Sequence, residues 1–172
     1  MIKRILVAID GSEHAVKALE LGSDMANLYG ADMTLVHVIS NEPIPDALLR
    51  VAEIEHVVTA PAGDLSVPMA PVIHGSDAVA QREQELREVR EHIGRKLLKD
   101  GEVLARSKKV GHVKSILEEG DPAERILARA DEETPDMIVV GSRGHSKVKA
   151  LVVGSVSNKV NHRAKCTCVI VK

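Results

Sequence analysis

The strongest constraint on the fold is a short, unbroken run of apolar residues near the start of the chain. The stretch KRILVAID, residues 3–10, carries no polar side chain between Arg4 and Asp10. A strand covered by helices on both faces has such a run, whereas a strand with one face in water alternates apolar and polar residues. The run therefore predicts a strand inside a parallel sheet.

The residues that follow predict a helix and then a second strand. Gly11 and Ser12 turn the chain, and Ser12 can cap a helix whose apolar residues keep helical spacing until Gly30. The stretch MTLVHVI, residues 33–39, predicts the next strand. Two strands joined through a helix form a parallel pair with a right-handed crossover.

The same alternation continues to the end of the chain. We expect further strands at residues 113–118, 137–140 and 167–172, and helices at 76–109, from Pro122 onward and at 155–162. Alternation of this kind predicts an α/β fold, a doubly wound open sandwich with helices on both faces of a parallel sheet. We expect one domain over residues 1–172.

One segment departs from the alternation. Residues 41–75 contain five of the seven prolines, and we expect a long, insertion-like and mostly irregular segment there, with a short helix near residues 46–56.

Composition excludes several classes of function. The net charge is −2, and no apolar run approaches the length of about 18 residues that a membrane helix needs. We therefore expect no nucleic acid and no membrane as partners, and, because the N-terminus lacks the features of a signal peptide, a cytoplasmic location. Cys166 and Cys168 have no further cysteine cluster near them, so we expect two reduced thiols on one face of a strand and no metal site.

Basic residues are concentrated near the C-terminus. Seven Lys and Arg residues, and no Asp or Glu, lie between Met137 and Lys172. Two explanations stay open: a solvated helix face, or a local field that attracts an anion.

Three glycines follow the strand expected at residues 137–140. Gly141 stands at its carboxyl end, Gly144 permits a turn, and Gly154 opens the last helix together with Ser155. Ligands collect at the carboxyl ends of parallel strands, and a helix N-terminus offers unpaired amides to phosphate. The segment therefore predicts a phosphate site, although ordinary turn glycines would explain the spacing as well. The P-loop and dinucleotide-binding glycine patterns are absent from the sequence.

The pattern G-x2-G-x9-G-S at Gly141, Gly144, Gly154 and Ser155 resembles the ATP-binding motif of the universal stress protein family. The resemblance extends to ILVAIDGSEHAVKALELG, LVHVI, GDPAERIL and GSVSNKV...CTCVIVK, and it leaves out roughly residues 41–110. It implies five parallel strands in the order 3-2-1-4-5, with Asp10 and Gly141 at the same crevice.

The resemblance also implies a ligand, an adenine nucleotide, namely ATP with or without Mg²⁺. Core packing and helix N-terminal charge compensation are the ordinary alternatives for the valines and for Asp10. The implied adenine and ribose residues are Ala8, Asp10, Val38, Val140 and Gly141, and the implied phosphate residues are Gly144, Gly154, Ser155, Val156 and Ser157.

We expect a homodimeric, nucleotide-dependent regulator in the stress response, pairing through its last strand and acting on an unidentified protein partner. Two alternatives stay open: a slow ATPase, and a dimeric interaction module without nucleotide. Only Asp10 and His145 are titratable candidates beside the phosphate site, and we assign no catalytic residue.

Overall fold

The computed structural model describes residues 1–41, 44, 48, 76–145 and 153–172. The chain divides into two compact units, one formed by Met1–Glu42 with Gly94–Lys172 and the other by Pro43–Ile93. The first unit holds the whole sheet and the candidate site. The short helix expected at residues 46–56 lies, apart from Leu48, outside the described residues.

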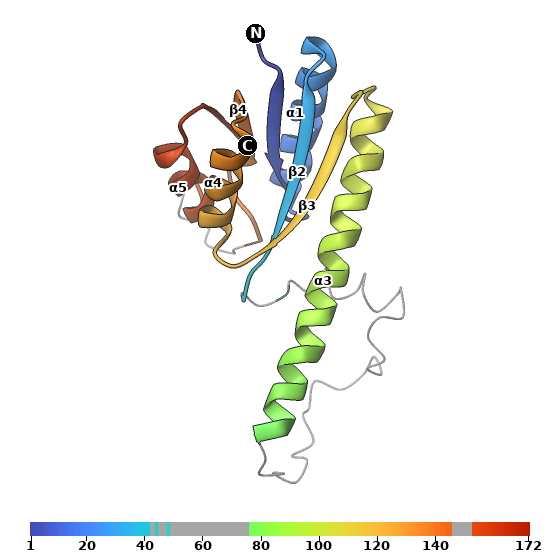
Figure 1. Ribbon diagram of the computed structural model, residues 1–172, viewed down its shortest axis with the longest axis vertical. Coiled ribbons are helices and arrows are strands. Elements are labelled where there is room, and N and C mark those ends of the chain that lie inside the picture. The colour runs from blue at the N-terminus through green and yellow to red at the C-terminus, as the bar shows by residue number, and fades with distance from the viewer. Residues whose placement is uncertain (42–43, 45–47, 49–75, 146–152) are drawn as a thin grey trace. The chain divides into compact units, whose positions relative to one another are not determined.

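A five-stranded parallel sheet forms the centre of the first unit (Figure 1). The strand order β3-β2-β1-β4-β5 confirms the expected order. Ala8 pairs with Val36 on one side and with Val140 on the other, so β1 and β4 end nearly level while β2 continues to Ile39. The strands are β1 (Arg4–Ala8), β2 (Asp32–Ile39), β3 (Val113–Glu119), β4 (Met137–Gly141) and β5 (Thr167–Val171).

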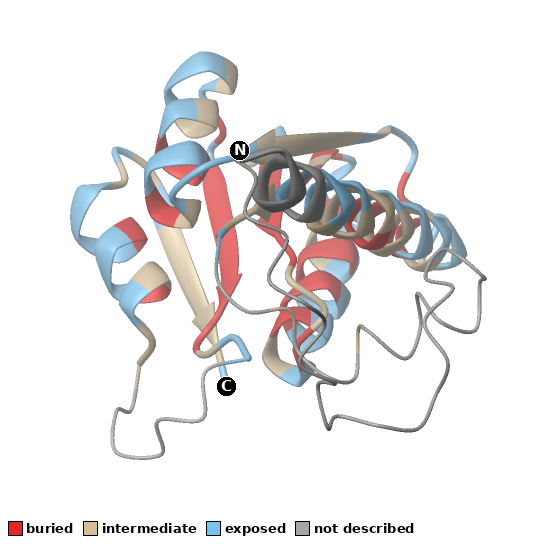
Figure 2. Ribbon diagram, turned by 90° about the horizontal axis from the view of Figure 1, so that it is seen from below, coloured by how far each residue is buried: buried red, intermediate tan, exposed pale blue. Residues whose placement is uncertain are grey.

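Helices cover both faces of this sheet, as the apolar run in β1 predicts. The helix α1 (Glu13–Tyr29) and the part of α3 (Ser76–Ser107) that begins at Gly94 pack on one face. The helices α4 (Pro122–Glu133) and α5 (Ser155–Arg163) lie on the other face. The central strands are consequently buried on both faces (Figure 2). Within the described ranges, no helix combines the length and apolar character that crossing a membrane requires.

The helix ends follow the signals in the sequence. The Ser12 hydroxyl accepts a hydrogen bond from the Ala15 amide and caps α1, and the left-handed Gly30 ends that helix. Asp121 caps α4 through the Glu124 amide. The first strand is shorter than expected and ends at Ala8, because the chain turns through the next four residues into α1.

Two glycines inside α3 allow the helix to approach the sheet closely. A Cβ atom on Gly94 would lie 2.7 Å from Leu117 Cδ1 and 2.8 Å from His37 Cδ2, and one on Gly101 would lie 3.1 Å from Leu35 Cδ1. Glycine lowers helix propensity by about 1 kcal/mol relative to alanine. Close packing of α3 on β2 and β3 explains why these positions nevertheless hold glycine.

The two cysteines lie on one face of the sheet, as their spacing predicts. Cys166 and Cys168 are free and partly buried against the cluster beneath α4 and α5. Burial raises the pKa of both thiols above the ordinary value. Both side chains therefore act as small apolar groups in the packing of β5.

Gly22 gives a direct test of the packing between α1 and β1. A Cβ atom at Gly22 would lie 2.8 Å from Val7 Cγ2, and Val7 is fully buried. We expect Gly22→Val to lower the free energy of unfolding by about 1–3 kcal/mol through overpacking, measured by urea denaturation. Gly111→Val is the matched control, because a Cβ atom at Gly111 meets nothing within 4 Å. Equal stability of the two variants would contradict the packing described here.

Candidate functional site

The candidate site lies at the carboxyl ends of β1 and β4, between which the sheet order reverses. The chain continues from β1 into α1 on one face and from β4 towards α5 on the opposite face. Open α/β sheets bind ligands at this position because the two connections diverge there. The expected switch point is therefore formed by the segments that the sequence motifs occupy.

The turn from β1 into α1 is tightly bonded. Gly11 has a φ of 84°, in the left-handed region that favours glycine. The amide of Ser12 donates to Asp10 Oδ1 at 2.8 Å. The Ser12 hydroxyl accepts from the Ala15 amide at 3.2 Å and donates to the Arg143 carbonyl at 3.2 Å. Ser12 therefore caps α1 and also joins it to the loop that follows β4.

Gly141 is required by the protein's own packing, and Gly144 lies close against a side chain of the turn. A Cβ atom on Gly141 would lie 2.8 Å from the Ala15 amide nitrogen, in the backbone of α1. A Cβ atom on Gly144 would lie 2.5 Å from Asp10 Oδ2. The absence of these two side chains lets the loop after β4 lie directly on the β1–α1 turn.

Gly154 is in a different situation. Its φ is −70°, and a Cβ atom there would come no closer than 3.4 Å to any of the described residues, the nearest atom being the Ser142 carbonyl oxygen. The amide of Gly154 donates to that carbonyl at 2.7 Å. Nothing in the part of the chain that the structure describes obstructs a Cβ atom at this position, so the packing of those residues does not explain the glycine.

The helix α5 begins without a capping side chain. Side chains cap α1 and α4, whereas Gly154, at the N-cap of α5, has none to offer. The first amides of a helix have no partner within it, and they carry partial positive charge. The Ser157 hydroxyl donates to the Gly141 carbonyl at 2.6 Å. This bond fixes the start of α5 beside the end of β4, and it leaves the exposed Ser155 with the only hydroxyl at the helix start that can meet a ligand.

The other expected nucleotide residues are mainly core residues at the border of the site. Ala8 and Val140 are 8% and 6% exposed. Val38 and Val156 are partly buried and pack on the same cluster beneath α4 and α5. Core packing therefore accounts for these four residues without a ligand, while their position still places them next to the switch point.

His37 contacts the turn after β1, although no sequence motif indicates it. Its Nδ1 donates to the Ile9 carbonyl at 2.8 Å, and its ring lies under Gly94 of α3. Burial lowers the pKa of His37, and nearby His145 adds to this effect, while the Ile9 carbonyl and Asp10 oppose it. The available signal was a single histidine in the otherwise apolar strand MTLVHVI.

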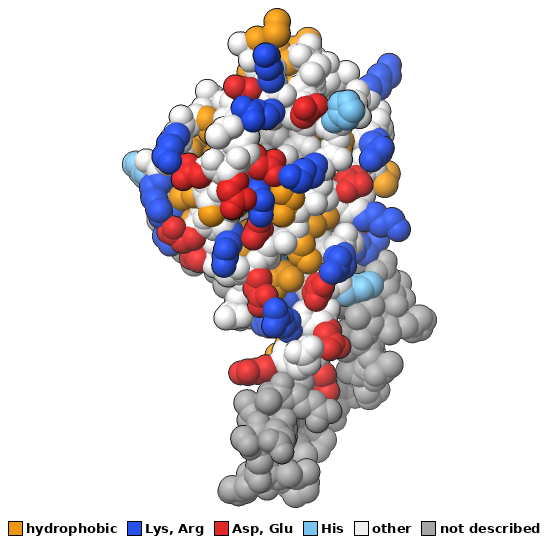
Figure 3. All heavy atoms as spheres, in the orientation of Figure 1, with side chains coloured by type: hydrophobic (Ala, Val, Ile, Leu, Met, Phe, Trp, Pro, Cys, Tyr) orange, Lys and Arg blue, Asp and Glu red, His pale blue; other side chains and the backbone are white. Residues whose placement is uncertain are grey.

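Ion pairs between α4 and α5 explain part of the basic cluster. Lys159 pairs with Asp121 at 3.6 Å, Lys165 pairs with Asp131 at 2.8 Å, and Arg163 pairs with Glu124. Acidic and basic side chains accordingly intermingle on the face shown in Figure 3. For these three residues the solvated helix face is the correct explanation. Arg143, in contrast, lies in the loop at the candidate site.

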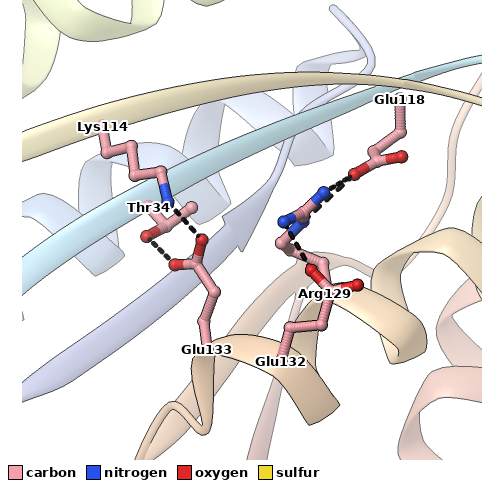
Figure 4. A network of polar contacts seen from close by, with 6 residues as sticks. All are labelled: Thr34, Lys114, Glu118, Arg129, Glu132 and Glu133. Carbon is pink, nitrogen blue, oxygen red and sulfur yellow. Dashed lines mark hydrogen bonds and ion pairs between the residues drawn. The ribbon is translucent and has the colours of Figure 1, made fainter.

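A hollow of about 480 Å³ lies at the opposite end of the sheet, where β1, β2 and β3 begin. Two of its charged groups are paired with each other: Glu133 accepts from Lys114 Nζ at 2.6 Å, and it also accepts from the Thr34 hydroxyl at 2.7 Å (Figure 4). Burial alone would raise the pKa of Glu133, but the bonds from Lys114 and Thr34 outweigh burial and lower it. A second set of ion pairs joins Arg129 of α4 to Glu118 of β3 and to Glu132 of α4. We therefore regard this hollow as structural.

The fold is that of a doubly wound α/β protein, and comparison with known proteins agrees. The family model of the universal stress protein family matches residues 1–172. Universal stress protein YxiE of Bacillus subtilis is 31% identical, with all of both chains covered. Stress response protein NhaX of the same organism is 33% identical, with 98% of this chain and 97% of the relative covered. The chain belongs to the universal stress protein family.

Solved structures show the same fold. A universal stress protein solved in complex with cAMP has a TM-score of 0.64 and 18% identity, covering 99% of this chain and 97% of that one. The universal stress protein of Archaeoglobus fulgidus in complex with dAMP has a TM-score of 0.56 and 19% identity, with both chains fully covered. At these identities the likeness establishes the fold alone.

The buried imidazole of His37 predicts a pH dependence of stability. Its folded pKa lies below the ordinary value of 6.5, so the unfolded chain takes up the proton at higher pH than the folded chain. We expect the free energy of unfolding to fall as the pH is lowered from 7.5 to 5. Carboxylates with lowered pKa values, such as Asp136, act only at more acidic pH.

The matched variants are His37→Asn, whose amide can replace the Nδ1 donor without titrating, and His162→Gln at an exposed position. Urea denaturation at both pH values should show a smaller loss for His37→Asn than for the unmodified protein and for His162→Gln. An unchanged loss in His37→Asn would show that this histidine does not cause the pH dependence.

Proposed function

We propose that this protein binds an adenine nucleotide, ATP with or without Mg²⁺, at the switch point, and that it acts as a nucleotide-dependent regulator in the cytoplasm. The single observation that carries the proposal is the uncapped start of α5 next to a glycine that the fold does not require. The related folds solved with cAMP and dAMP support the choice of an adenine nucleotide. Such a regulator would act on a protein partner, and no surface feature of the described residues identifies that partner.

The phosphates are assigned to the start of α5. The amides of Ser155, Val156 and Ser157 lie in the first turn and can donate to phosphate oxygens, with the helix dipole adding a favourable field. A side chain at Gly154 would fill the space next to these amides. Arg143 lies in the adjoining loop and supplies a positive charge near the phosphates.

The adenine and ribose are assigned to the ends of β1 and β2. The Val36 carbonyl accepts the Ile9 amide, and backbone groups along a strand alternate between its two sides. The amide and carbonyl of Val38 therefore face the side on which β1 has already ended, where an adenine edge can bind them. The Asp10 carboxylate is the group in reach of a ribose hydroxyl.

The bonding of the titratable groups favours binding over hydrolysis. Asp10 Oδ1 accepts the Ser12 amide, and His145 Nε2 donates to the Asp10 carbonyl. Both groups thus maintain the turn, whereas a general base must be directed at the attacking water. We therefore place a slow ATPase second to a nucleotide-binding regulator.

Gly154 and Ser155 test the phosphate assignment. Gly154→Val should abolish ATP binding, because its side chain occupies the phosphate position while the fold accommodates the Cβ atom. Ser155→Ala should weaken binding less, since losing one hydrogen bond to a charged group costs about 1.5–3 kcal/mol, roughly 10- to 150-fold in affinity. Both are measured by isothermal titration calorimetry.

Gly111→Val serves as the control, because its Cβ atom also meets nothing and it lies at the opposite end of the sheet, in the turn before β3. It should bind ATP as well as the unmodified protein does. The phosphate assignment would be wrong if Gly154→Val bound ATP with unchanged affinity while remaining folded by circular dichroism.

We further propose a homodimer through β5. This strand is at the edge of the sheet and pairs only with β4 among the described residues. Its residues 168–171 are only partly buried (Figure 2), and the charged residues that flank it in the sequence are Lys165 and Lys172. An unguarded apolar edge favours pairing with another chain, and a two-fold axis closes such an assembly.

Light scattering at micromolar concentration tests the dimer. The expected mass is twice the 18.5 kDa of one chain, and Val169→Lys should lower it by placing an ammonium group in the middle of the edge. Val169 also packs partly on the α1 side of the sheet, so circular dichroism must show that the variant stays folded. A mass of one chain for the unmodified protein would refute the dimer.

A further inference from the structure

Two histidines hold consecutive carbonyl groups of the turn between β1 and α1. The Ile9 amide donates to the Val36 carbonyl at 2.9 Å, and the Ile9 carbonyl accepts from His37 Nδ1 at 2.8 Å. The next carbonyl, that of Asp10, accepts from His145 Nε2 at 2.8 Å. The donors come from different segments, β2 and the loop after β4, so the turn is fixed from two directions.

The two histidines differ in burial, and this difference indicates what each hydrogen bond does. The ring of His37 lies between β2 and α3 and contributes to packing. His145 is exposed, so its bond adds little to the core. The bond connects the loop after β4, which contains Gly144, to Asp10, whose carboxylate belongs to the candidate site.

The orientation of the Asp10 carboxylate is fixed by a hydrogen bond to one of its two oxygen atoms. Oδ1 accepts the Ser12 amide at 2.8 Å. Oδ2 is directed at Gly144, where a Cβ atom would lie only 2.5 Å away, and among the described residues no hydrogen bond to Oδ2 is found. The bond from His145 holds the Asp10 carbonyl, and with it the stretch of backbone from which this carboxylate extends.

We propose that His145 is a positioning residue for nucleotide binding: its hydrogen bond to the Asp10 carbonyl fixes the backbone of Asp10 and thereby holds the carboxylate beside the loop after β4, where the proposed function has it meet the ribose. This inference rests on the proposed nucleotide function. The rival role for an exposed imidazole in this loop is direct contact with phosphate. The two roles differ in what they require of the ligand, because a positioning residue acts on any ligand with a ribose, whereas a phosphate contact acts only on ligands with phosphate.

The test compares adenosine with ATP on four forms of the protein. These are the unmodified protein, His145→Ala, His145→Gln and the control His112→Ala, whose side chain is exposed at the opposite end of the sheet. Glutamine can place an amide donor where Nε2 lies, and it does not titrate. Calorimetric titrations at pH 8 keep the charge of histidine side chains out of the comparison, and urea denaturation checks that the variants remain equally stable.

We expect His145→Ala to lose affinity for adenosine and for ATP by the same factor, roughly 2- to 12-fold for one neutral hydrogen bond. His145→Gln should recover most of that loss, and His112→Ala should bind as the unmodified protein does. Loss of ATP affinity alone, no loss with either ligand, or failure of His145→Gln to recover affinity would each overturn the positioning role. If the unmodified protein bound neither ligand, the proposed function would fail and this inference with it.

Discussion

The contact between the β1–α1 turn and the loop after β4 determines the geometry of the site. It depends on close approach of two backbones, which Gly141 and Gly144 permit because a Cβ atom at either position would meet the backbone of α1 or the Asp10 carboxylate. The Ser12 hydroxyl then bridges the two segments, since it caps α1 and donates to the Arg143 carbonyl. Without this contact the two loops of the switch point would have no fixed relation to each other.

The same contact shows that the motif glycines have more than one physical role. Gly141 and Gly144 serve the protein's own packing, whereas Gly154 is surrounded by ordinary distances. One glycine motif can therefore combine positions that shape the loop with a position that leaves room for a ligand. We expect a substitution at Gly154 to separate a binding defect from a folding defect, because a Cβ atom there comes no closer than 3.4 Å to the described residues.

Most of the fold could be predicted from the sequence because its signals are local. Apolar runs and caps such as Ser12, Gly30 and Asp121 mark the elements, and the structure confirms them. The sequence could not reveal the role of His37 or the reason for Gly94, since both depend on α3 packing against β2. Nor could the sequence decide whether the basic residues near the C-terminus form surface ion pairs or attract an anionic ligand. That decision needs the position of α4 beside α5.

The central claim is that an adenine nucleotide binds at the carboxyl ends of β1 and β4, with its phosphates at the start of α5. Mapping amide chemical shifts of the unmodified protein by nuclear magnetic resonance during titration with ATP tests it most directly. The account predicts the largest changes at Gly154, Ser155 and Val156, with smaller ones in the turn at Asp10. Largest changes at Thr34 and Lys114, in the hollow at the opposite end of the sheet, or no change at any residue, would contradict it.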